Sequence, residues 1–226
     1  MLASELYITF HGIGEPRVPL APGEERYFVS REQFEMAVET LHGLEERYAI
    51  RANITFDDGN LSDFEVGLPV LQKHGRKGRF FVLAGRIGKE GYLSAGQIRE
   101  LAASGMEIGS HGYDHVDWRG LDQKGRQREF TDARRKIEDV LGKPVMTAAL
   151  PFGGFDQHVL AHLKTAGFQR VFTSSQGLAM RGSWFCPRRS LTRDFDPASG
   201  LAEIVKPPAK FKGVAYALAR RLRYRF

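Results

Sequence analysis

Two neighbouring carboxylates lie at the end of a short apolar stretch in the first third of the chain. Asp57 and Asp58 directly follow Ile54-Thr55-Phe56 and directly precede Gly59, so the pattern predicts a buried strand followed by a sharp turn. Adjacent carboxylates at the end of a buried strand repel each other and are costly to desolvate. A bound cation or a shared proton would remove that conflict, and a solvated Asp-Gly turn is the alternative without a ligand.

A pair of histidines supplies further ligands for such a cation. His111 and His115 follow the apolar run Met106–Gly109, and we expect the two side chains to lie on one face of a helical turn. One carboxylate with two imidazoles, and with positions left for water, is typical of a catalytic rather than a structural zinc site. The sequence therefore predicts a metal site that combines one of the two acids with both histidines.

A third motif, Pro151-Phe152-Gly153, completes a pattern known from one family. Together with Thr55–Gly59 and the histidine pair His111 and His115, it resembles the polysaccharide deacetylase family, the NodB-homology or carbohydrate esterase 4 group. The resemblance extends over about residues 50–195. It implies a distorted (β/α) barrel of the NodB type, with seven strands, and a hydrolase that removes N-acetyl groups from an amino sugar.

The resemblance also implies roles for individual residues. The ligands of one divalent metal, expected to be zinc with cobalt, manganese and nickel as alternatives, would be Asp58, His111 and His115. Asp57 would be the general base for the metal-activated water, and the backbone N–H of Phe152 would donate to the oxyanion. The expected substrate contacts are Pro151 and Gly153 in that loop and, as flat apolar faces for a sugar ring, Trp118 and Trp184.

The chain departs from the family pattern at two places. The family has an arginine two residues before the proline of the third motif, which orients the catalytic aspartate, and this chain has Ala149 there. We expect Arg188 or Arg189 to supply the guanidinium from a later strand end. The family's general acid, a histidine near the end of the domain, is also absent. His11 is the expected substitute, and slow turnover is the alternative.

The elements that would carry these residues alternate along the chain. Alternating strands and helices predict a parallel α/β layout, and in a parallel barrel the functional side chains gather at the carboxyl ends of strands. His11 lies in the polar ending of the predicted strand Leu6–Gly12, which shares Ile-Thr-Phe with residues 54–56. Further strands are expected at residues 78–83, 106–109, 145–150 and 170–173, and helices are expected after Ser30, Ser94 and Asp156 and over residues 130–141.

Length and composition favour one domain. The chain has 226 residues, and we expect a NodB-like domain over residues 1–202 and a basic amphipathic helix over residues 203–226. A single cysteine, Cys186, allows no intrachain disulfide and fits a reducing compartment. No signal-peptide pattern and no membrane-spanning apolar run is apparent, so we expect a cytoplasmic protein.

The net charge of +6 bears on the expected partners. The basic residues lack the interleaved aromatic residues of RNA-binding modules, so nucleic acid is not an expected partner. The expected partners are an N-acetylated glycan or sugar precursor and, through residues 203–226, an anionic membrane at its inner face. Packing of that last helix on the barrel is the alternative.

Three functions are compatible with the motifs. The first is metal-dependent N-deacetylation of an amino sugar in a glycan or in its lipid-linked precursor. The second is hydrolysis of another non-peptide C–N bond on the same fold, as in the allantoinase-like and formamidase relatives. The third is a non-catalytic, glycan-binding member, which the altered third motif and the absent late histidine keep open.

Overall fold

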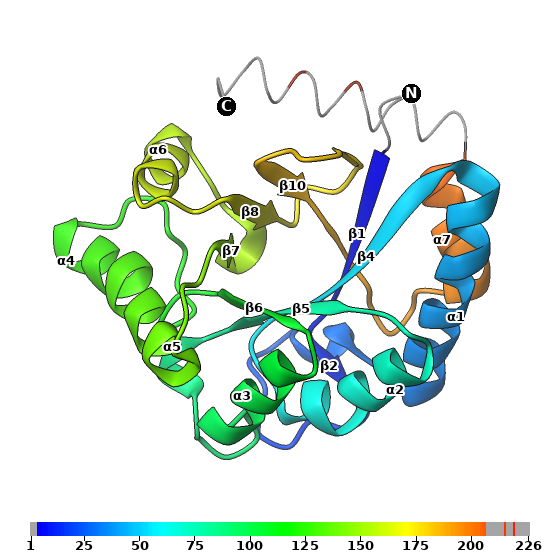
Figure 1. The fold of residues 1–226 in the computed structure, drawn as a ribbon, viewed down its shortest axis with the longest axis horizontal. Helices are drawn as coiled ribbons and strands as arrows, with labels where there is room; N and C mark the ends of the chain where they lie inside the picture. The colour runs from blue at the N-terminus through cyan, green and yellow to red at the C-terminus, as the bar shows by residue number, and fades with distance from the viewer. Residues whose placement is uncertain (1–3, 207–214, 216–218, 220–226) are drawn as a thin grey trace.

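One mainly parallel sheet, curved into a nearly closed barrel, forms the centre of the protein. The structure is a computed structural model, and it describes residues 4–206 together with residues 215 and 219. The strand order is β10-β8-β7-β6-β5-β4-β1-β11, with β9 antiparallel to β1, and the helices lie around the outside (Figure 1). The predicted (β/α) barrel is confirmed.

The first six strands of the barrel occur where apolar runs of the sequence predict them, and the three short strands after residue 178 had no predicted range. The barrel strands are β1 (Ser4–Phe10), β4 (Ile50–Phe56), β5 (Gly78–Val82), β6 (Glu107–Ser110), β7 (Thr147–Ala149), β8 (Arg170–Thr173), β9 (Ala179–Met180), β10 (Phe185–Pro187) and β11 (Arg189–Ser190). The segment between β1 and the first helix contains two short strands that pair in parallel, β2 (Gly12–Ile13) and β3 (Phe28–Val29), and a 3₁₀ turn, η1 (Glu25–Tyr27).

A single segment joins the two edges of the sheet. β10 pairs with β8 and β11 pairs with β1, while only Arg188 lies between β10 and β11 in the chain. If β10 and β11 are counted as one strand, the path contains seven parallel strands, as in a seven-stranded barrel. The closure therefore places Arg188 at the seam of the barrel.

The repeated Ile-Thr-Phe sequences of β1 and β4 pair in register. Phe10 lies opposite Phe56, the two threonine hydroxyls, of Thr9 and Thr55, are 2.8 Å apart, and the Asp57 N–H donates to the Phe10 carbonyl. The residues after the two strands, His11 and Asp57, therefore leave the sheet at the same level.

The helices cover the barrel, and three of them begin at the predicted caps Ser30, Ser94 and Asp156. The helices are α1 (Arg31–Tyr48), α2 (Leu68–Lys73), α3 (Ala95–Ala103), α4 (Gln123–Arg126), α5 (Ala133–Leu141), α6 (Gln157–Thr165) and α7 (Pro197–Val205). Ser30 and Ser94 form capping boxes with Gln33 and Gln97, and Asp156 accepts from the Val159 N–H. Two π-helical stretches, η2 (Asp63–Gly67) and η4 (Gln127–Asp132), precede α2 and α5, and two short 3₁₀ turns are η3 (Ala84–Arg86) and η5 (Pro151–Gly153).

Aromatic packing fills the space between the sheet and α1. The ring of Phe56 stacks on Phe80 with centroids 4.4 Å apart, and Phe10 meets Phe34 of α1 edge-on at 4.7 Å. Burying such rings contributes more than their area alone, because edge and face arrangements add about 0.5–1.5 kcal/mol per pair. This packing gives the carboxyl ends of β1 and β4 a rigid support.

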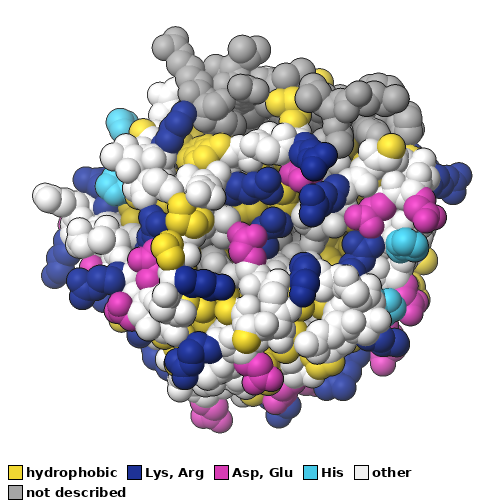
Figure 2. Space-filling model, in the orientation of Figure 1, with side chains coloured by type: hydrophobic (Ala, Val, Ile, Leu, Met, Phe, Trp, Pro, Cys, Tyr) yellow, Lys and Arg dark blue, Asp and Glu magenta, His cyan; other side chains and the backbone are white. Residues whose placement is uncertain are grey.

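Basic side chains line a groove formed by the amino-terminal ends of the strands. Arg51, Arg76 and Arg79 line a cavity of about 800 Å³ there, and Figure 2 shows Lys and Arg side chains near the middle of the face in view. Two of these arginines are paired, Arg76 with Glu45 and Arg79 with Glu107, both at 2.7 Å. Much of the positive charge of this groove is therefore neutralised locally.

The predicted basic helix over residues 203–226 lies mostly outside the described residues, so its conformation and role stay predictions. Within the part of the chain that the structure describes, no helix has the length and apolar character needed to cross a bilayer.

Candidate active site

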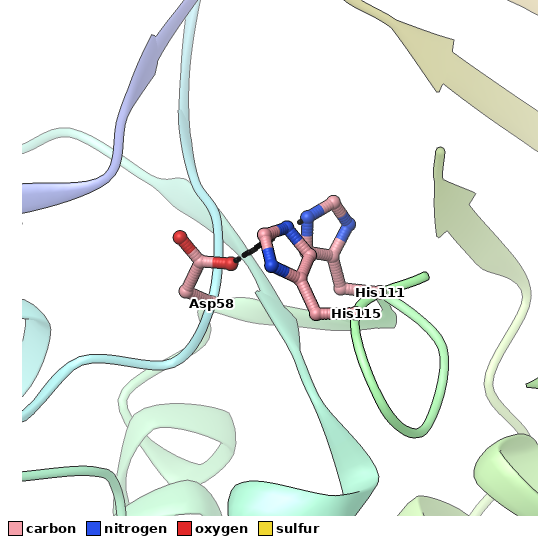
Figure 3. Close-up of side chains that lie close together, drawn as sticks. All are labelled: Asp58, His111 and His115. Carbon is pink, nitrogen blue, oxygen red and sulfur yellow. Dashed lines mark ion pairs between the residues drawn. The ribbon is translucent and has the colours of Figure 1, made fainter. Parts of the chain in front are cut away.

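The carboxyl ends of three strands bring the predicted site residues together. His11 follows β1, Asp57 and Asp58 follow β4, and His111 follows β6. Figure 3 shows that the side chains of Asp58, His111 and His115 point toward one another, and their ligand atoms all lie within 4.8 Å of one another.

The donor set fits a divalent cation. The Asp58 Oδ1 atom lies 3.5 Å from His115 Nε2 and 3.7 Å from His111 Nε2. This oxygen is buried and has no hydrogen-bond partner in the described structure. A buried carboxylate oxygen without a partner is costly, and a cation shared with the two imidazoles would remove that cost.

The charge state of Asp58 supports the same interpretation. Burial and, to a smaller extent, the like charge of Asp57 raise the pKa of Asp58 to about 6, against the lowering effect of His11. The protein itself therefore does little to stabilise the ionised form, which is the form that a metal requires.

The imidazole of His111 is oriented for ligation. Its Nδ1 lies 2.9 Å from the carbonyl oxygen of Ala149, and since a carbonyl only accepts, the proton is on Nδ1. Nε2 then carries a lone pair toward Asp58. Burial lowers the pKa of His111 to about 3 and also lowers the pKa of His115, so both rings stay neutral near pH 7.

The predicted helical turn from His111 to His115 is wrong. These residues form a loop after β6, in which Gly112 (φ 87°) and His115 (φ 60°) adopt left-handed conformations. The loop folds back on itself, so the two rings lie 5.3 Å apart without a helix. A Cβ atom at Gly112 would come within 2.4 Å of a carboxylate oxygen of Glu129, which explains the glycine.

Glu129 holds this loop in place, and the sequence reasoning missed it. Its carboxylate, on η4, is 1% exposed and accepts from the backbone N–H groups of Tyr113 (2.8 Å) and Asp114 (3.0 Å) and from Nε1 of Trp118 (3.3 Å). The charged helix pattern around it gave no signal, because a glutamate there is normally solvated. Glu129 therefore supports the backbone between the two histidines.

Arg188 provides the guanidinium that the third motif lacks. Its Nη1 and Nη2 atoms donate to the two carboxylate oxygens of Asp57 at 2.6 and 2.7 Å, and both side chains are buried. The neighbouring Arg189 instead donates to the exposed Gln176 amide oxygen at 3.2 Å. Of the two expected arginines, the structure brings Arg188 to Asp57.

The pair keeps Asp57 ionised. Burial raises the pKa of Asp57, but the charge of the Arg188 guanidinium and its hydrogen bonds lower it by more, so the pKa lies well below its ordinary value. Asp57 Oδ2 lies 3.8 Å from His111 Nε2, so this carboxylate faces the same space as the three candidate ligands.

His11 lies on the other side of Asp57. Its Nε2 is 3.9 Å from Asp57 Oδ2, its ring packs on Tyr27 with centroids 4.9 Å apart, and its Nδ1 is buried without a hydrogen-bond partner among the described residues. With a side chain 20% exposed, His11 borders a cavity of about 150 Å³ above the candidate ligands.

Of the third motif, Pro151-Phe152-Gly153, only Phe152 lines this cavity. Phe152 has a left-handed backbone (φ 56°), is 66% exposed and stacks on His115 with centroids 4.6 Å apart. Pro151 is buried, and a Cβ atom at Gly153 would come within 2.8 Å of the Ser174 backbone. Pro151 and Gly153 thus shape the loop, and Phe152 is the member that faces the site.

Neither tryptophan offers a face to a sugar at this cavity. Trp118 is 2% exposed, because it packs on Phe130 and donates to Glu129. Trp184 precedes β10, so it lies at the amino-terminal edge of the sheet, and its Nε1 donates to the Phe168 carbonyl at 2.7 Å. The expectation for these two residues is wrong, and Tyr27, Tyr92 and Phe152 are the aromatic residues of the cavity.

Comparison with known proteins agrees with this geometry. The family model described as polysaccharide deacetylase matches residues 47–171. The protein YxkH of Bacillus subtilis (strain 168), whose name places it among the polysaccharide deacetylases, is 30% identical to this chain over 128 residues. The match covers 57% of this chain and 46% of YxkH. A chitin deacetylase of Pestalotiopsis sp is 29% identical over 150 residues, which cover 58% of this chain and 50% of that protein.

The fold is also similar to that of a polysaccharide deacetylase from Bacillus cereus. That crystal structure has a TM-score of 0.76 at 22% identity, and the match covers 90% of this chain and 69% of that chain. The chain spans about half the length of the curated relatives that it matches.

Proposed function

The chain belongs to the polysaccharide deacetylase family, and on this basis we propose that it is a metal-dependent hydrolase that removes N-acetyl groups from an amino sugar. The substrate would be a unit of a polysaccharide or of a glycan precursor, which the similarity to a chitin deacetylase supports. The observation that carries the proposal is the convergence of Asp58, His111 and His115 beside the ionised Asp57.

Asp58, His111 and His115 would hold the metal, with zinc as the first choice and cobalt, manganese or nickel as alternatives. Two imidazoles and one carboxylate suit these ions better than magnesium, which prefers oxygen ligands. When bound, such a metal polarises the acetyl carbonyl and lowers the pKa of a bound water toward about 7.

Asp57 would take the proton of the attacking water. A carboxylate of low pKa is a weak base, so Asp57 could serve only for a water that a bound metal would make more acidic. The two hydrogen bonds from Arg188 hold the carboxylate plane in one orientation, which fixes the remaining lone pairs of Asp57 relative to the space that the imidazoles border.

The negative charge that develops on the acetyl oxygen needs a fixed donor. The backbone N–H of Phe152 is our candidate, because its loop folds over His115. The leaving amine needs a proton, and His11, 3.9 Å from Asp57 Oδ2 at the cavity wall, would donate it.

Acetate release from N-acetylated chito-oligomers tests this proposal. Protein stripped with chelator should be inactive, and one equivalent of zinc or cobalt per chain should restore acetate release. Asp58→Asn should lose both metal binding and activity, while Asp122→Asn, an exposed helix cap, should keep both. Acetate release that is unchanged after chelation, or a protein that binds no metal, would contradict the proposal.

A second candidate is hydrolysis of another small amide on the same machinery. The cavity of about 150 Å³ favours it, because ordinary ligand pockets measure about 300–1,000 Å³. Formamide-type and ureido substrates, assayed for ammonia release with the same metal, separate this activity from deacetylation.

Contact with a membrane is a further part of the proposal and rests on sequence. Residues 203–226 carry clustered arginines and aromatic residues, which favour peripheral contact with anionic lipid at the cytoplasmic face. Sedimentation with anionic and with neutral vesicles tests it, and absence of binding at low salt would contradict it.

A further inference from the structure

The segment between β5 and α3 forms one wall of the cavity and is hydrogen-bonded to the residues that directly follow Asp58. The Leu93 N–H donates to the Gly59 carbonyl and the Leu61 N–H to the Gly91 carbonyl, both at 2.9 Å, and Asn60 and Tyr92 form an antiparallel bridge. The residues that make these contacts, Gly59, Asn60 and Leu61, directly follow Asp58 in the chain. Residues of this wall are therefore held at a defined position relative to the candidate metal site.

Arg86 is the basic residue of this wall. Its guanidinium lies over the ring of Tyr92, 4.9 Å from the centroid, and the residue lines the cavity together with Asp58 and His115. Stacking on a fixed aromatic ring restricts the long side chain, so part of the entropy cost of binding a ligand is already met.

Arg86 has no ion-pair partner among the described residues. Half-buried arginines elsewhere in the protein do pair, as Arg76 does with Glu45 and Arg134 with Glu138. The cavity also contains Glu24, but that carboxylate lies beyond ion-pair distance from Arg86 and accepts from the Ala21 N–H. A half-buried guanidinium without an anion is unfavourable, so the wall is suited to an anion supplied by a ligand.

The cavity limits what that ligand can be. Its volume of about 150 Å³ is small, and the rings of Tyr27, Tyr92 and Phe152 border it. Aromatic rings pack well against the apolar faces of a sugar. These dimensions favour one amino-sugar unit that enters end-on over a polymer lying across the site.

We propose that the amino-sugar unit that this site binds carries an anionic group, a carboxylate or a phosphate, and that Arg86 binds that group. This inference rests on the proposed N-deacetylase function, because it concerns the substrate of the same site. Arg86 donates two N–H groups to the anion, while the acetamido group lies toward Asp58, His111 and His115.

Calorimetric binding to the zinc-loaded protein tests the inference. The ligands are N-acetylglucosamine, N-acetylglucosamine 1-phosphate, N-acetylmuramic acid and inorganic phosphate. We expect one or both anionic sugars to bind about 10- to 100-fold more tightly than the neutral sugar, because hydrogen bonds to charged groups are worth about 1.5–3 kcal/mol. The two anionic sugars distinguish a phosphate from a carboxylate.

Two variants assign the preference to Arg86. Arg86→Gln should reduce the preference for the anionic sugar to less than about threefold, and Arg86→Lys should retain part of it. The matched control is Lys89→Gln, which removes one positive charge from the same segment outside the cavity lining and should keep the full preference. Unchanged thermal unfolding of the variants shows that they are folded.

Three results would overturn the inference. The first is a wild-type protein that binds all three sugars equally. The second is a preference for the anionic sugars that remains in Arg86→Gln, which is the result expected if the anion binds directly to zinc. The third is inorganic phosphate binding as tightly as the sugar phosphate. Acetate release is measured in parallel. If no sugar is deacetylated while Arg86 still sets the binding preference, the proposed activity fails and the anion site stands.

Discussion

Asp57 and Arg188, 131 residues apart in the sequence, form two hydrogen bonds of 2.6 and 2.7 Å at the seam of the barrel. Arg188 is the single residue between β10 and β11, so the segment that closes the sheet also delivers the guanidinium to the carboxyl end of β4. Closure of the barrel and orientation of the proposed base are therefore one structural feature.

Loss of Arg188 should destabilise the fold as well as the activity. Arg188→Gln leaves a buried carboxylate without its partner, which costs about 3–5 kcal/mol in the free energy of unfolding at neutral pH. The folded pKa of Asp57 is lowered, so the stabilisation is present above the unfolded pKa of about 3.9 and is lost as the pH falls through the folded value. Urea unfolding at pH 7 and pH 3 measures both effects.

The neighbouring arginine provides the control for this experiment. Arg189→Gln removes a guanidinium that donates to the exposed Gln176 amide and lies 5.7 Å from the centroid of the Phe195 ring, so the free energy of unfolding should change by less than about 1 kcal/mol. The double variant Arg188→Gln, Asp57→Asn should recover part of the loss, because no buried charge is left unpaired. Equal effects of the two single arginine variants would show that the pair is not stabilising.

Metal affinity should depend on pH through Asp58. The pKa of Asp58 is raised to about 6, whereas the pKa of His111 is lowered to about 3 and that of His115 is also lowered. Below about pH 6 the metal must displace a proton from Asp58, so its affinity should fall about tenfold per pH unit. Competition titrations with a fluorescent zinc chelator between pH 8 and pH 4.5 measure this slope.

In the metal-free protein, the ionisation of Asp58 should lower the stability of the fold as the pH rises. A carboxyl group whose folded pKa is raised favours the folded state below its unfolded pKa, and this contribution is lost as the pH rises through about 6. Metal-free Asp58→Asn should therefore unfold at higher urea concentration than metal-free wild type at pH 8 and not at pH 4. An Asp58→Asn variant that is less stable at pH 8 would exclude the raised pKa.

Glu129 should influence metal binding without touching the metal. Glu129→Ala removes the acceptor for the N–H groups of Tyr113 and Asp114, so the loop between the two histidines loses its support. Second-layer changes of this kind typically cost about 10- to 100-fold in metal affinity. Glu129→Gln, which keeps one acceptor oxygen, should retain part of the metal affinity that Glu129→Ala loses.

The control for Glu129 lies on the same stretch of helix. Asp132→Asn changes a half-buried carboxylate of η4 that accepts from the Gln127 side chain, and it should leave the zinc dissociation constant unchanged. If the metal-free Glu129→Ala variant is less stable than wild type but binds zinc with the same affinity, Glu129 supports the fold and not the geometry of the metal ligands.

The sequence allowed much of the barrel to be predicted because its signals are local. The strands before His11 and Asp57 share Ile-Thr-Phe, and Ser30 and Ser94 sit at the helix starts where they act as caps. The order of the three motifs also predicted which side chains would meet, because parallel strands place their carboxyl ends on one edge.

Other features depend on contacts between distant parts of the chain. Whether Arg188 or Arg189 would reach Asp57 depends on which residue of the closing segment faces the barrel interior, and a shift of one residue reverses that. The path from His111 to His115 depends on Glu129 and on the left-handed Gly112, which helical spacing cannot indicate. Trp118 is drawn into the core by the same carboxylate.

His11 should matter for amide substrates and much less for an activated ester. An amine leaves only when protonated, whereas the phenolate of 4-nitrophenyl acetate departs without a proton. His11→Ala should therefore lower kcat for acetamido sugars by about 100-fold or more and change ester hydrolysis by less than about threefold. Initial rates on both substrates with the zinc-loaded protein provide the measurement, and His42→Ala, which changes a side chain that is 76% exposed, should leave both rates unchanged. An equal loss on the two substrates would mean that His11 shapes the site or supports Asp57, to which its Nε2 is 3.9 Å, and an unchanged amide rate would mean that another group protonates the amine.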